Sequence, residues 1–233
     1  MQTNEIVSPS DWVAARKLLL QEEKDLQRAR DALAVKRRAL PWVLVDKDYH
    51  FDTSTGQKSL EDLFNGRDQL IVWHFMFGED WSQGCPSCSF WADQYVPGVK
   101  HMNHRDVSLV AVSTAPLVKL LAYRDRMGWS FVWVSSGRSD FNRDFAVTFE
   151  TEIVEGDELA YNFETLPAHG EEMPGLSVFA RGDDGAIYRT YSTYARGLDP
   201  MNAVYQHLDL TPKSRDEEGL SFPMEWVRRH DQY

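Results

Sequence analysis

The run QLIVWHFMF, residues 69–77, constrains the fold of this chain more than any other segment. It is almost continuously apolar and bounded by charged residues, which is typical of a strand buried on both faces of a sheet. The loop GEDWSQG follows it and leads into CPSCSFWADQY, which contains Cys85 and Cys88, the two cysteines of the chain. The sequence therefore predicts a buried strand, a loop, and then a helix that begins at the cysteine pair.

Strands and helices alternate along the chain from Pro41 onward. The turn dipeptide Asp184-Gly185 joins two strands into a hairpin. The order β-α-β-α-β-α followed by β-β-α predicts an α/β domain. The expected strands span residues 41–51, 69–77, 107–114, 131–135, 176–180 and 186–192, and the expected helices span residues 59–64, 85–95, 116–129, 140–147 and 199–210.

A long helix is expected before this domain, over residues 8–40, with Ser10 as its N-cap and Pro41 as its stop. Mixed charges cover most of its surface, and its apolar positions form one narrow stripe. This pattern favours a solvated helix packed along that stripe, and the alternative is an arm through which two copies form a homodimer. The stripe consists of Trp12, Ala15, Leu19, Leu26, Ala29 and Leu33.

Three regions follow from these patterns: a helical arm over 1–40, a core domain over 41–210 and a polar tail over 211–233. Residues 148–174 are acidic, contain Gly and Pro, and show little periodicity. We expect them to form an insertion in the core domain or a long loop at the active site.

The composition excludes several functional classes. The chain has 36 acidic and 25 basic residues, a net charge of -11, which repels nucleic acid and anionic membrane surfaces. No apolar run approaches the roughly 20 residues of a membrane span. The N-terminus lacks the basic and then apolar pattern of a signal peptide. We therefore expect a cytoplasmic protein with no nucleic-acid or membrane partner.

The cysteine pair carries the predicted chemistry. A helix N-terminus presents free N–H groups and partial positive charge, which stabilise a thiolate and lower its pKa. Cys85, at that end, is the expected nucleophile, and Cys88, one turn further and more buried, is expected to resolve the mixed disulfide. Pro86 lacks an N–H and suits the first helical turn. Side chains three residues apart on a helix lie close enough to form a disulfide.

Two alternatives stay open for the pair. The residues could be ordinary buried cysteines, or they could supply half of a zinc site with His101 and His104. The two histidines are closer in sequence than the zinc-finger pattern requires. A helix over 85–96 would also hold them about 20 Å from Cys88. We therefore favour redox chemistry and expect no metal and no cofactor.

Several residues near the pair have two interpretations. His74 lies in the buried run, where a hydrogen-bonded core histidine is favoured over a proton carrier for the thiols. Glu79 and Asp80 would oppose thiolate formation if they lie close to it. Three aromatic residues either shield the pair or belong to the core: Trp81, Phe90 and Trp91.

The segment STYARG could line the same cleft through Thr193, Tyr194 and Arg196. Arg196 either attracts an anionic substrate and favours a thiolate, or forms a surface ion pair.

Several long motifs resemble one bacterial family. They include MFGEDWSQGCPSCSFWAD, FVWVSSGRSDFNRDFAV, GLSVFARGDDGAIYRTYSTYARGLD and the tail WVRRHDQY. Over nearly its whole length the chain is similar to domain-of-unknown-function family 899, whose members are called predicted dithiol-disulfide oxidoreductases or thioredoxin-like proteins. The resemblance implies a thioredoxin-like, peroxiredoxin-related three-layer sandwich with an N-terminal helical extension and with Cys85 and Cys88 in the redox position. A thioredoxin-like arrangement also implies a cis proline at Pro174 that faces the pair and presents backbone to a bound peptide or thiol.

The motif around the pair departs from two better-known patterns. Gly84 precedes the pair and Pro86-Ser87 lies inside it, so the thioredoxin signature Trp-Cys-Gly-Pro-Cys is not present. Trp81 and Ser82 stand where the peroxiredoxin motif Pro-x-x-x-Thr-x-x-Cys has its threonine region. These departures favour disulfide exchange over peroxide reduction.

The predicted function is that of a thiol-disulfide oxidoreductase that acts on a disulfide-containing protein or a small thiol and is served by an unidentified electron donor. One alternative is a thiol peroxidase in which Cys85 forms a sulfenic acid that Cys88 resolves. The other is a non-enzymatic redox sensor or binding scaffold. The expected substrate-binding residues are Trp81, Pro86, Ser87, Pro174 and Arg196.

Overall fold

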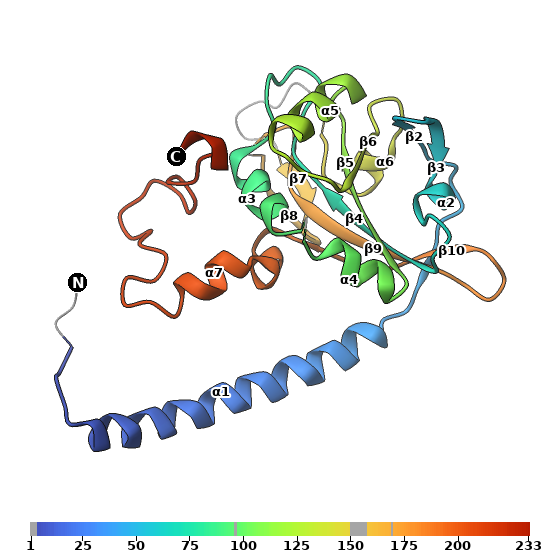
Figure 1. Cartoon of the computed structure of the whole chain (residues 1–233). Coiled ribbons are helices and arrows are strands. Elements are labelled where there is room, and N and C mark those ends of the chain that lie inside the picture. The colour runs from blue at the N-terminus through green and yellow to red at the C-terminus, as the bar shows by residue number, and fades with distance from the viewer. Residues whose placement is uncertain (1–3, 96, 150–157, 169) are drawn as a thin grey trace. The chain divides into compact units, whose positions relative to one another are not determined.

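The computed structural model describes residues 4–95, 97–149, 158–168 and 170–233. The chain forms two compact units that divide after Trp42. The first unit contains helix α1, Pro9–Arg38 (Figure 1). Its N-cap is Ser8, whose hydroxyl accepts the N–H of Asp11 at 3.2 Å, so the prediction of Ser10 is wrong. Pro9 shifts the start of the helix because a residue without an N–H is best placed in the first turn.

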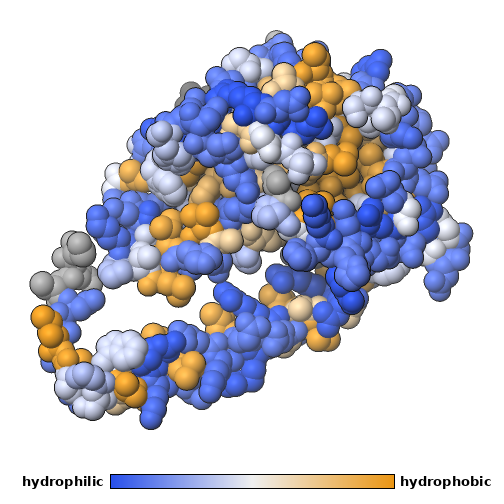
Figure 2. Space-filling model, viewed as in Figure 1, coloured by the Kyte–Doolittle hydropathy of each residue, from blue (hydrophilic) through white to orange (hydrophobic). Residues whose placement is uncertain are grey.

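Helix α1 has no buried residue. It is mostly hydrophilic in Figure 2, with separate apolar patches. Trp12 of the predicted stripe is 59% exposed and Leu19 is 51% exposed. Ion pairs between charged residues, such as Arg16 with Glu23 at 2.7 Å, lie along its surface. The pairing of two copies through this arm stays a prediction. Among the described helices, none is both long and apolar enough to cross a membrane.

The second unit is built on an eight-stranded mixed sheet. Its strand order is β1-β10-β9-β4-β5-β6-β2-β3, with β4, β5 and β6 parallel and β9 antiparallel to β4. A separate hairpin consists of β7, Glu158–Tyr161, and β8, Glu164–Pro167. The strands of the main sheet are β1, Val43–Leu44; β2, His50–Thr53; β3, Gly56–Ser59; β4, Gln69–His74; β5, Val107–Ser113; β6, Val132–Ser135; β9, Gly175–Arg181; and β10, Ile187–Tyr194.

Helices cover both faces of this sheet. The helices are α2, Leu60–Leu63; α3, Pro86–Tyr95; α4, Val99–His104; α5, Leu117–Arg126; α6, Phe141–Asp144; and α7, Ala203–Leu208, with short 3-10 helices at Ala195–Met201 and His230–Gln232. Alternate residues of β4 enter two different cores. Trp73 packs with residues of α3, α5 and α7, whereas Val72 packs with residues of α2 and α6. The result is a three-layer sandwich. The succession β4-α3-β5, then β9-β10-α7, is thioredoxin-like, as predicted.

The strand predicted over 41–51 is wrong as a single element. Val43 and Leu44 pair with β10 at one edge of the sheet, whereas His50–Thr53 pairs with β3 and β6 at the opposite edge. A continuous strand cannot serve both edges, so the chain crosses the domain between them. Helix α4 was not expected, and part of the insertion predicted over 148–174 lies outside the described residues.

Local signals account for several element boundaries. Ser59 and Asp62 form a capping box at the start of α2. Gly185 has a φ of +81°, which favours glycine, and it closes the turn between β9 and β10.

Neighbouring positions on α5 test the core assignment. Leu120 is fully buried and Val118 is 74% exposed. We expect Leu120→Ala to lower the free energy of unfolding by about 2–5 kcal/mol, because it leaves a cavity. Val118→Ala should change it by less than about 0.5 kcal/mol. Urea denaturation followed by circular dichroism measures both values, and equal losses would contradict this packing.

Candidate functional site

The backbone of Met76 connects Cys85 to the end of the central strand. Its carbonyl accepts the N–H of Cys85 at 3.1 Å, and its own N–H acts to lower the pKa of the Cys88 thiol. Strand β4 ends at His74, so the bond to Cys85 places the start of α3 directly beyond the strand. Pro86 is the first residue of α3, and Cys85 immediately precedes it.

Cys85 is half-buried, and its sulfur faces several hydrogen-bond donors. The thiol of Cys88 and the backbone N–H groups of Cys88 and Ser87 point to it, and Arg229 adds positive charge. These interactions lower the pKa of Cys85 to about 7, although burial acts in the opposite direction. A substantial fraction of Cys85 is therefore ionised at neutral pH.

Cys88 is only 2% exposed. Burial raises the pKa of its thiol well above the ordinary value, and its hydrogen bond to Cys85 acts in the same direction. The two sulfurs are within hydrogen-bond reach, and both cysteines are free. The arrangement is thus an ionisable outer thiol beside a buried protonated one, and the ionised thiol is the form that can attack a disulfide.

The C-terminal segment contributes a cation to this site. Arg229 donates from Nη2 to the carbonyl of Gly84 at 2.7 Å and from Nε to the hydroxyl of Tyr123 at 2.9 Å. That hydroxyl lies 2.9 Å from Ser89 Oγ, which donates to the carbonyl of Cys85 at 2.9 Å. A continuous hydrogen-bond network therefore connects the tail, α5 and the start of α3.

Gly84 is required by this close packing. A Cβ at this position would lie 2.7 Å from a ring atom of Phe75 and 2.8 Å from a ring atom of Tyr123. Both rings belong to the core, so neither has room to move. A larger residue before Cys85 would displace Tyr123 and the network that it joins.

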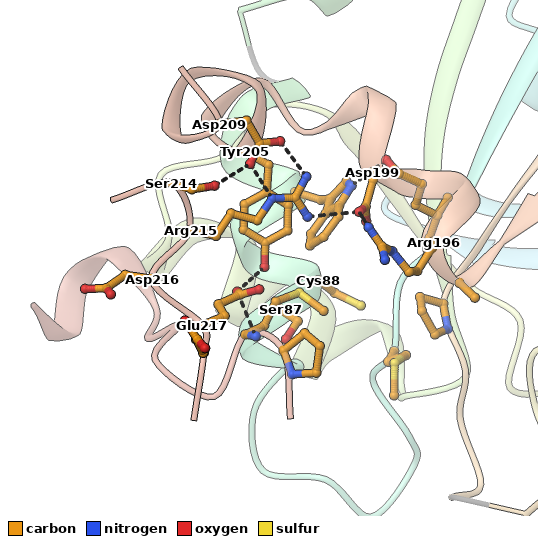
Figure 3. Close-up of a pocket in the computed structure, with 18 of the residues that line it drawn as sticks. Ser87, Cys88, Arg196, Asp199, Tyr205, Asp209, Ser214, Arg215, Asp216 and Glu217 are labelled. Atoms are coloured by element: carbon orange, nitrogen blue, oxygen red, sulfur yellow. Dashed lines mark hydrogen bonds and ion pairs between the residues drawn. The ribbon is translucent and has the colours of Figure 1, made fainter. Parts of the chain in front are cut away.

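A cavity of about 770 Å³ lies beside Cys88 (Figure 3). Trp73, Met76 and Trp91 form apolar parts of its wall, and the C-terminal region contributes Asp209 and residues 213–218. In Figure 3, Arg215 lies between Asp209 and Asp199 and over the ring of Tyr205, 3.9 Å from its centroid. The cavity has the size of sites that bind small molecules or part of a peptide.

The structure brings several of the predicted site residues together. Ser87, Pro174 and Arg196 line this cavity with Cys88, and Pro86 is half-buried at the start of α3. Arg196 is highly exposed and pairs with Asp199 at 3.2 Å, which agrees with the surface ion pair among its two interpretations.

The aromatic residues near the pair are mainly core residues. Trp91 is buried, lines the cavity and donates from Nε1 to the carbonyl of Leu198 at 3.1 Å. Phe90 packs against Trp91 and Tyr205. Trp81 does not line this cavity. It packs beside Gly78 at the edge of the same core.

The prediction of a cis proline is wrong, because the peptide bond before Pro174 is trans. The chain reaches β9 in an extended conformation: the N–H of Met173 donates to the carbonyl of Val147 at 2.8 Å, and Thr148 pairs with Glu172. Tyr161 then donates to the carbonyl of Pro174 at 2.6 Å. Pro174 still lies at the cavity.

Other candidates lie away from the thiols. His74 stacks on Phe141 and Phe145, on the face of the sheet opposite to Cys88, and burial lowers its pKa to about 3. It bonds Ser177 at 2.9 Å, as a core histidine does, and is too remote to carry protons for the pair. Tyr194 and Thr193 are buried and do not line the cavity.

The acidic residues of the preceding loop lie at a different hollow. Glu79 and Asp80 are exposed and line a second, polar cavity of about 610 Å³. His101 and His104 are exposed on α4. Within the described part of the chain, no three His, Cys, Asp or Glu residues form a group that could hold a metal ion.

Two residues of the site were missed by the sequence analysis: Arg229 and Glu172. Glu172 is 4% exposed and accepts hydrogen bonds from Thr114 at 2.6 Å and from Thr148 at 3.0 Å. Burial raises its pKa to about 7, and when ionised it raises the pKa of Cys88. Nothing in the local pattern EEMPG distinguishes a buried carboxyl from a surface one, and nothing in WVRRHDQY distinguishes Arg229 from Arg228.

Replacement of Arg229 tests its action on Cys85. Arg229→Gln should raise the pKa of Cys85 by about 0.5 to 1, because a nearby cation is lost, and Arg229→Lys should restore part of the effect. The pH dependence of alkylation by iodoacetamide, measured in a Cys88→Ser background, reports this pKa. Arg228→Gln is the matched control, since the side chain of Arg228 donates only to the nearby carbonyls of Glu225 and Val227 in the described structure. A pKa unchanged by Arg229→Gln would contradict the assignment.

The raised pKa of Glu172 should make the stability of the protein depend on pH. Its folded-state pKa of about 7 lies above the unfolded value near 4.5, so the unfolded chain holds fewer protons between these values. Stability is therefore lost as pH rises from about 4.5 to about 7. Relative to wild type, Glu172→Gln should gain about 3 kcal/mol over that interval, measured by urea denaturation at several pH values. Glu171→Gln, the control, should keep most of the wild-type dependence of stability on pH. If the stability of Glu172→Gln changes with pH in parallel with that of the wild type, burial does not perturb the Glu172 carboxyl.

Comparisons with known proteins place the chain in a family. Among curated proteins, no match was found. Peroxidoxin BcpB from Mycobacterium tuberculosis is similar in structure, with 14% identity over 71% of this chain and 96% of its own and a TM-score of 0.46. Peroxiredoxin Q from Xanthomonas campestris has 15% identity over 73% of this chain and 98% of its own, with a TM-score of 0.44. A mutant of PrxQ from Xylella fastidiosa has 11% identity over 71% of this chain and 95% of its own, with a TM-score of 0.45.

The family model described as "Bacterial protein of unknown function (DUF899)" matches residues 1–233. The chain therefore belongs to this bacterial family, as its long motifs had indicated.

Proposed function

We propose that this protein is a thiol-disulfide oxidoreductase whose reactive pair is Cys85 and Cys88. The observation that carries the proposal is the placement of the two thiols: Cys85 is half-buried directly before the first residue of α3, and Cys88 is 2% exposed one turn further. The pKa of Cys85 is lowered to about 7, while burial raises the pKa of Cys88. An attacking thiol is most effective when its pKa lies near the ambient pH.

The reaction balances in two steps. The Cys85 thiolate attacks one sulfur of a substrate disulfide, and the substrate S–S bond breaks to give a mixed disulfide and a substrate thiolate. That thiolate takes the proton of Cys88. The Cys88 thiolate then attacks the sulfur of Cys85 and expels the second substrate thiolate, which takes a proton from water.

The products are a Cys85–Cys88 disulfide and two substrate thiols, so the substrate has gained two electrons. A dithiol donor must then reduce the pair for a second turnover. We propose that Ser87, Pro86 and Pro174 contact the mixed disulfide. Ser87 and Pro174 line the cavity at Cys88, and Pro86 is the first residue of α3, which supports this role.

The two steps predict different stoichiometries in single turnover. Reduced wild-type protein, mixed with excess hydroxyethyl disulfide, should release two thiols per chain and end with an internal disulfide. Cys88→Ser should release one thiol and keep a mixed disulfide on Cys85, because no resolving thiol remains. Thiol titration and intact-protein mass spectrometry measure both results.

Cys85→Ser is the control and should release no thiol at a comparable rate. Equal thiol release from wild-type protein and Cys85→Ser would refute the assignment. If hydrogen peroxide oxidises Cys85 to a sulfenic acid much faster than any disulfide reacts, the protein is a thiol peroxidase instead.

A further inference from the structure

The cavity beside Cys88 has an apolar floor. Trp73, Trp91 and Leu198 are buried core residues that line it, and Met76 and Met224 are half-buried beside them. Aromatic and thioether surfaces of this kind gain free energy when apolar groups cover them. A ligand that fills about 770 Å³ here must place apolar atoms next to Cys88, and Cys85 lies directly before the helix that carries Cys88.

The mouth of the cavity is negatively charged. Its lining has five carboxylates and three cations, which leaves a net charge of -2. All three cations already lie near carboxylates: Arg196 is 3.2 Å from Asp199, and Lys213 is 3.9 Å from Asp216. Arg215 is 3.0 Å from Asp199 and 2.8 Å from Asp209.

A carboxylate on a substrate would therefore compete with resident carboxylates for each of these cations. Asp216 is well exposed, and Glu218 is exposed beside it, so both present negative charge to an approaching molecule. Such a field slows the entry of anions and favours neutral or cationic molecules.

We infer that the cavity selects a small disulfide with apolar substituents that carry no negative charge, and that it discriminates against anionic disulfides of the glutathione type. The inference rests on the proposed exchange at Cys85, because it names the substrate of that reaction. It also argues against one of the two roles that the sequence allowed for Arg196, namely the attraction of an anionic substrate.

Two aromatic disulfides of opposite character test this selection. Dithiodipyridine is uncharged at neutral pH, whereas dithiobis(nitrobenzoate) carries two carboxylates. The rate of each with reduced wild-type protein is divided by its rate with dithiothreitol, which removes its intrinsic reactivity. We expect the corrected rate to favour the uncharged compound by about tenfold at low salt and less at high salt.

Charge variants locate the effect. Glu218→Lys should lower the ratio of the two corrected rates, uncharged over anionic, by about threefold or more, because it reverses a charge at the mouth of the cavity. Asp183→Lys makes the same change in net charge on the exposed turn between β9 and β10, at the opposite end of β9 from Pro174, and should leave the preference unchanged. Met224→Ser should slow the aromatic compound relative to hydroxyethyl disulfide, because it removes apolar wall.

Binding separates this inference from the exchange reaction. Both aromatic disulfides are titrated by calorimetry into a variant with Cys85→Ser and Cys88→Ser. Tighter binding of the uncharged compound supports the inference, whether or not the wild-type protein reduces it. If the wild-type protein reduces neither compound, only the proposed exchange is overturned. Equal corrected rates with equal affinities, a preference for the anionic compound, or faster reduction of insulin than of any small disulfide would overturn the inference.

Discussion

The backbone hydrogen bond from Cys85 to the carbonyl of Met76 is the interaction that fixes the site. It holds the residue before α3 against the end of the central strand, and Cys88 follows one turn along the helix. Because β4 pairs with β5 on one side and β9 on the other, this point cannot move without disturbing the middle of the sheet. The cysteines are therefore held at the middle of the sheet, and backbone N–H groups at the start of α3 stabilise the Cys85 thiolate.

The charged side chains around the cysteines come from parts of the chain that are distant in sequence. Arg229 comes from the C-terminal segment and contacts Gly84, 145 residues earlier in the sequence. Asp231 binds Arg126 of α5 through two hydrogen bonds of 2.7 and 3.0 Å, and His230 lies 2.7 Å from Asp93 of α3. The tail is thus a structural part of the site. It supplies the cation for Cys85, and the preceding residues form the wall of the cavity.

The local elements of the domain were largely predictable, because their signals lie within the elements. The apolar run before the cysteines became β4, Pro86 began α3, and Asp184-Gly185 closed the β9–β10 turn. Two larger errors arose where partners distant in sequence decide the structure. The segment after Pro41 forms two strands that pair near opposite edges of the sheet. The peptide bond before Pro174 is trans, and the chain just before it pairs through residues 172–173 with residues 147–148. The family resemblance supplied the three-layer architecture, which periodicity alone leaves open.

The position of the cysteine pair follows from its neighbours in the sequence: it lies after a buried strand and at the beginning of a helix, with the first cysteine at the helix terminus. Local hydrogen bonding enforces this position. The charges that surround the pair depend instead on the tertiary structure. Arg229 and Arg228 are adjacent and identical in type, as are Glu171 and Glu172, yet one member of each pair acts on a cysteine. Electrostatic interactions depend on distance in space and on burial, and both are set by the packing of segments that are remote in sequence.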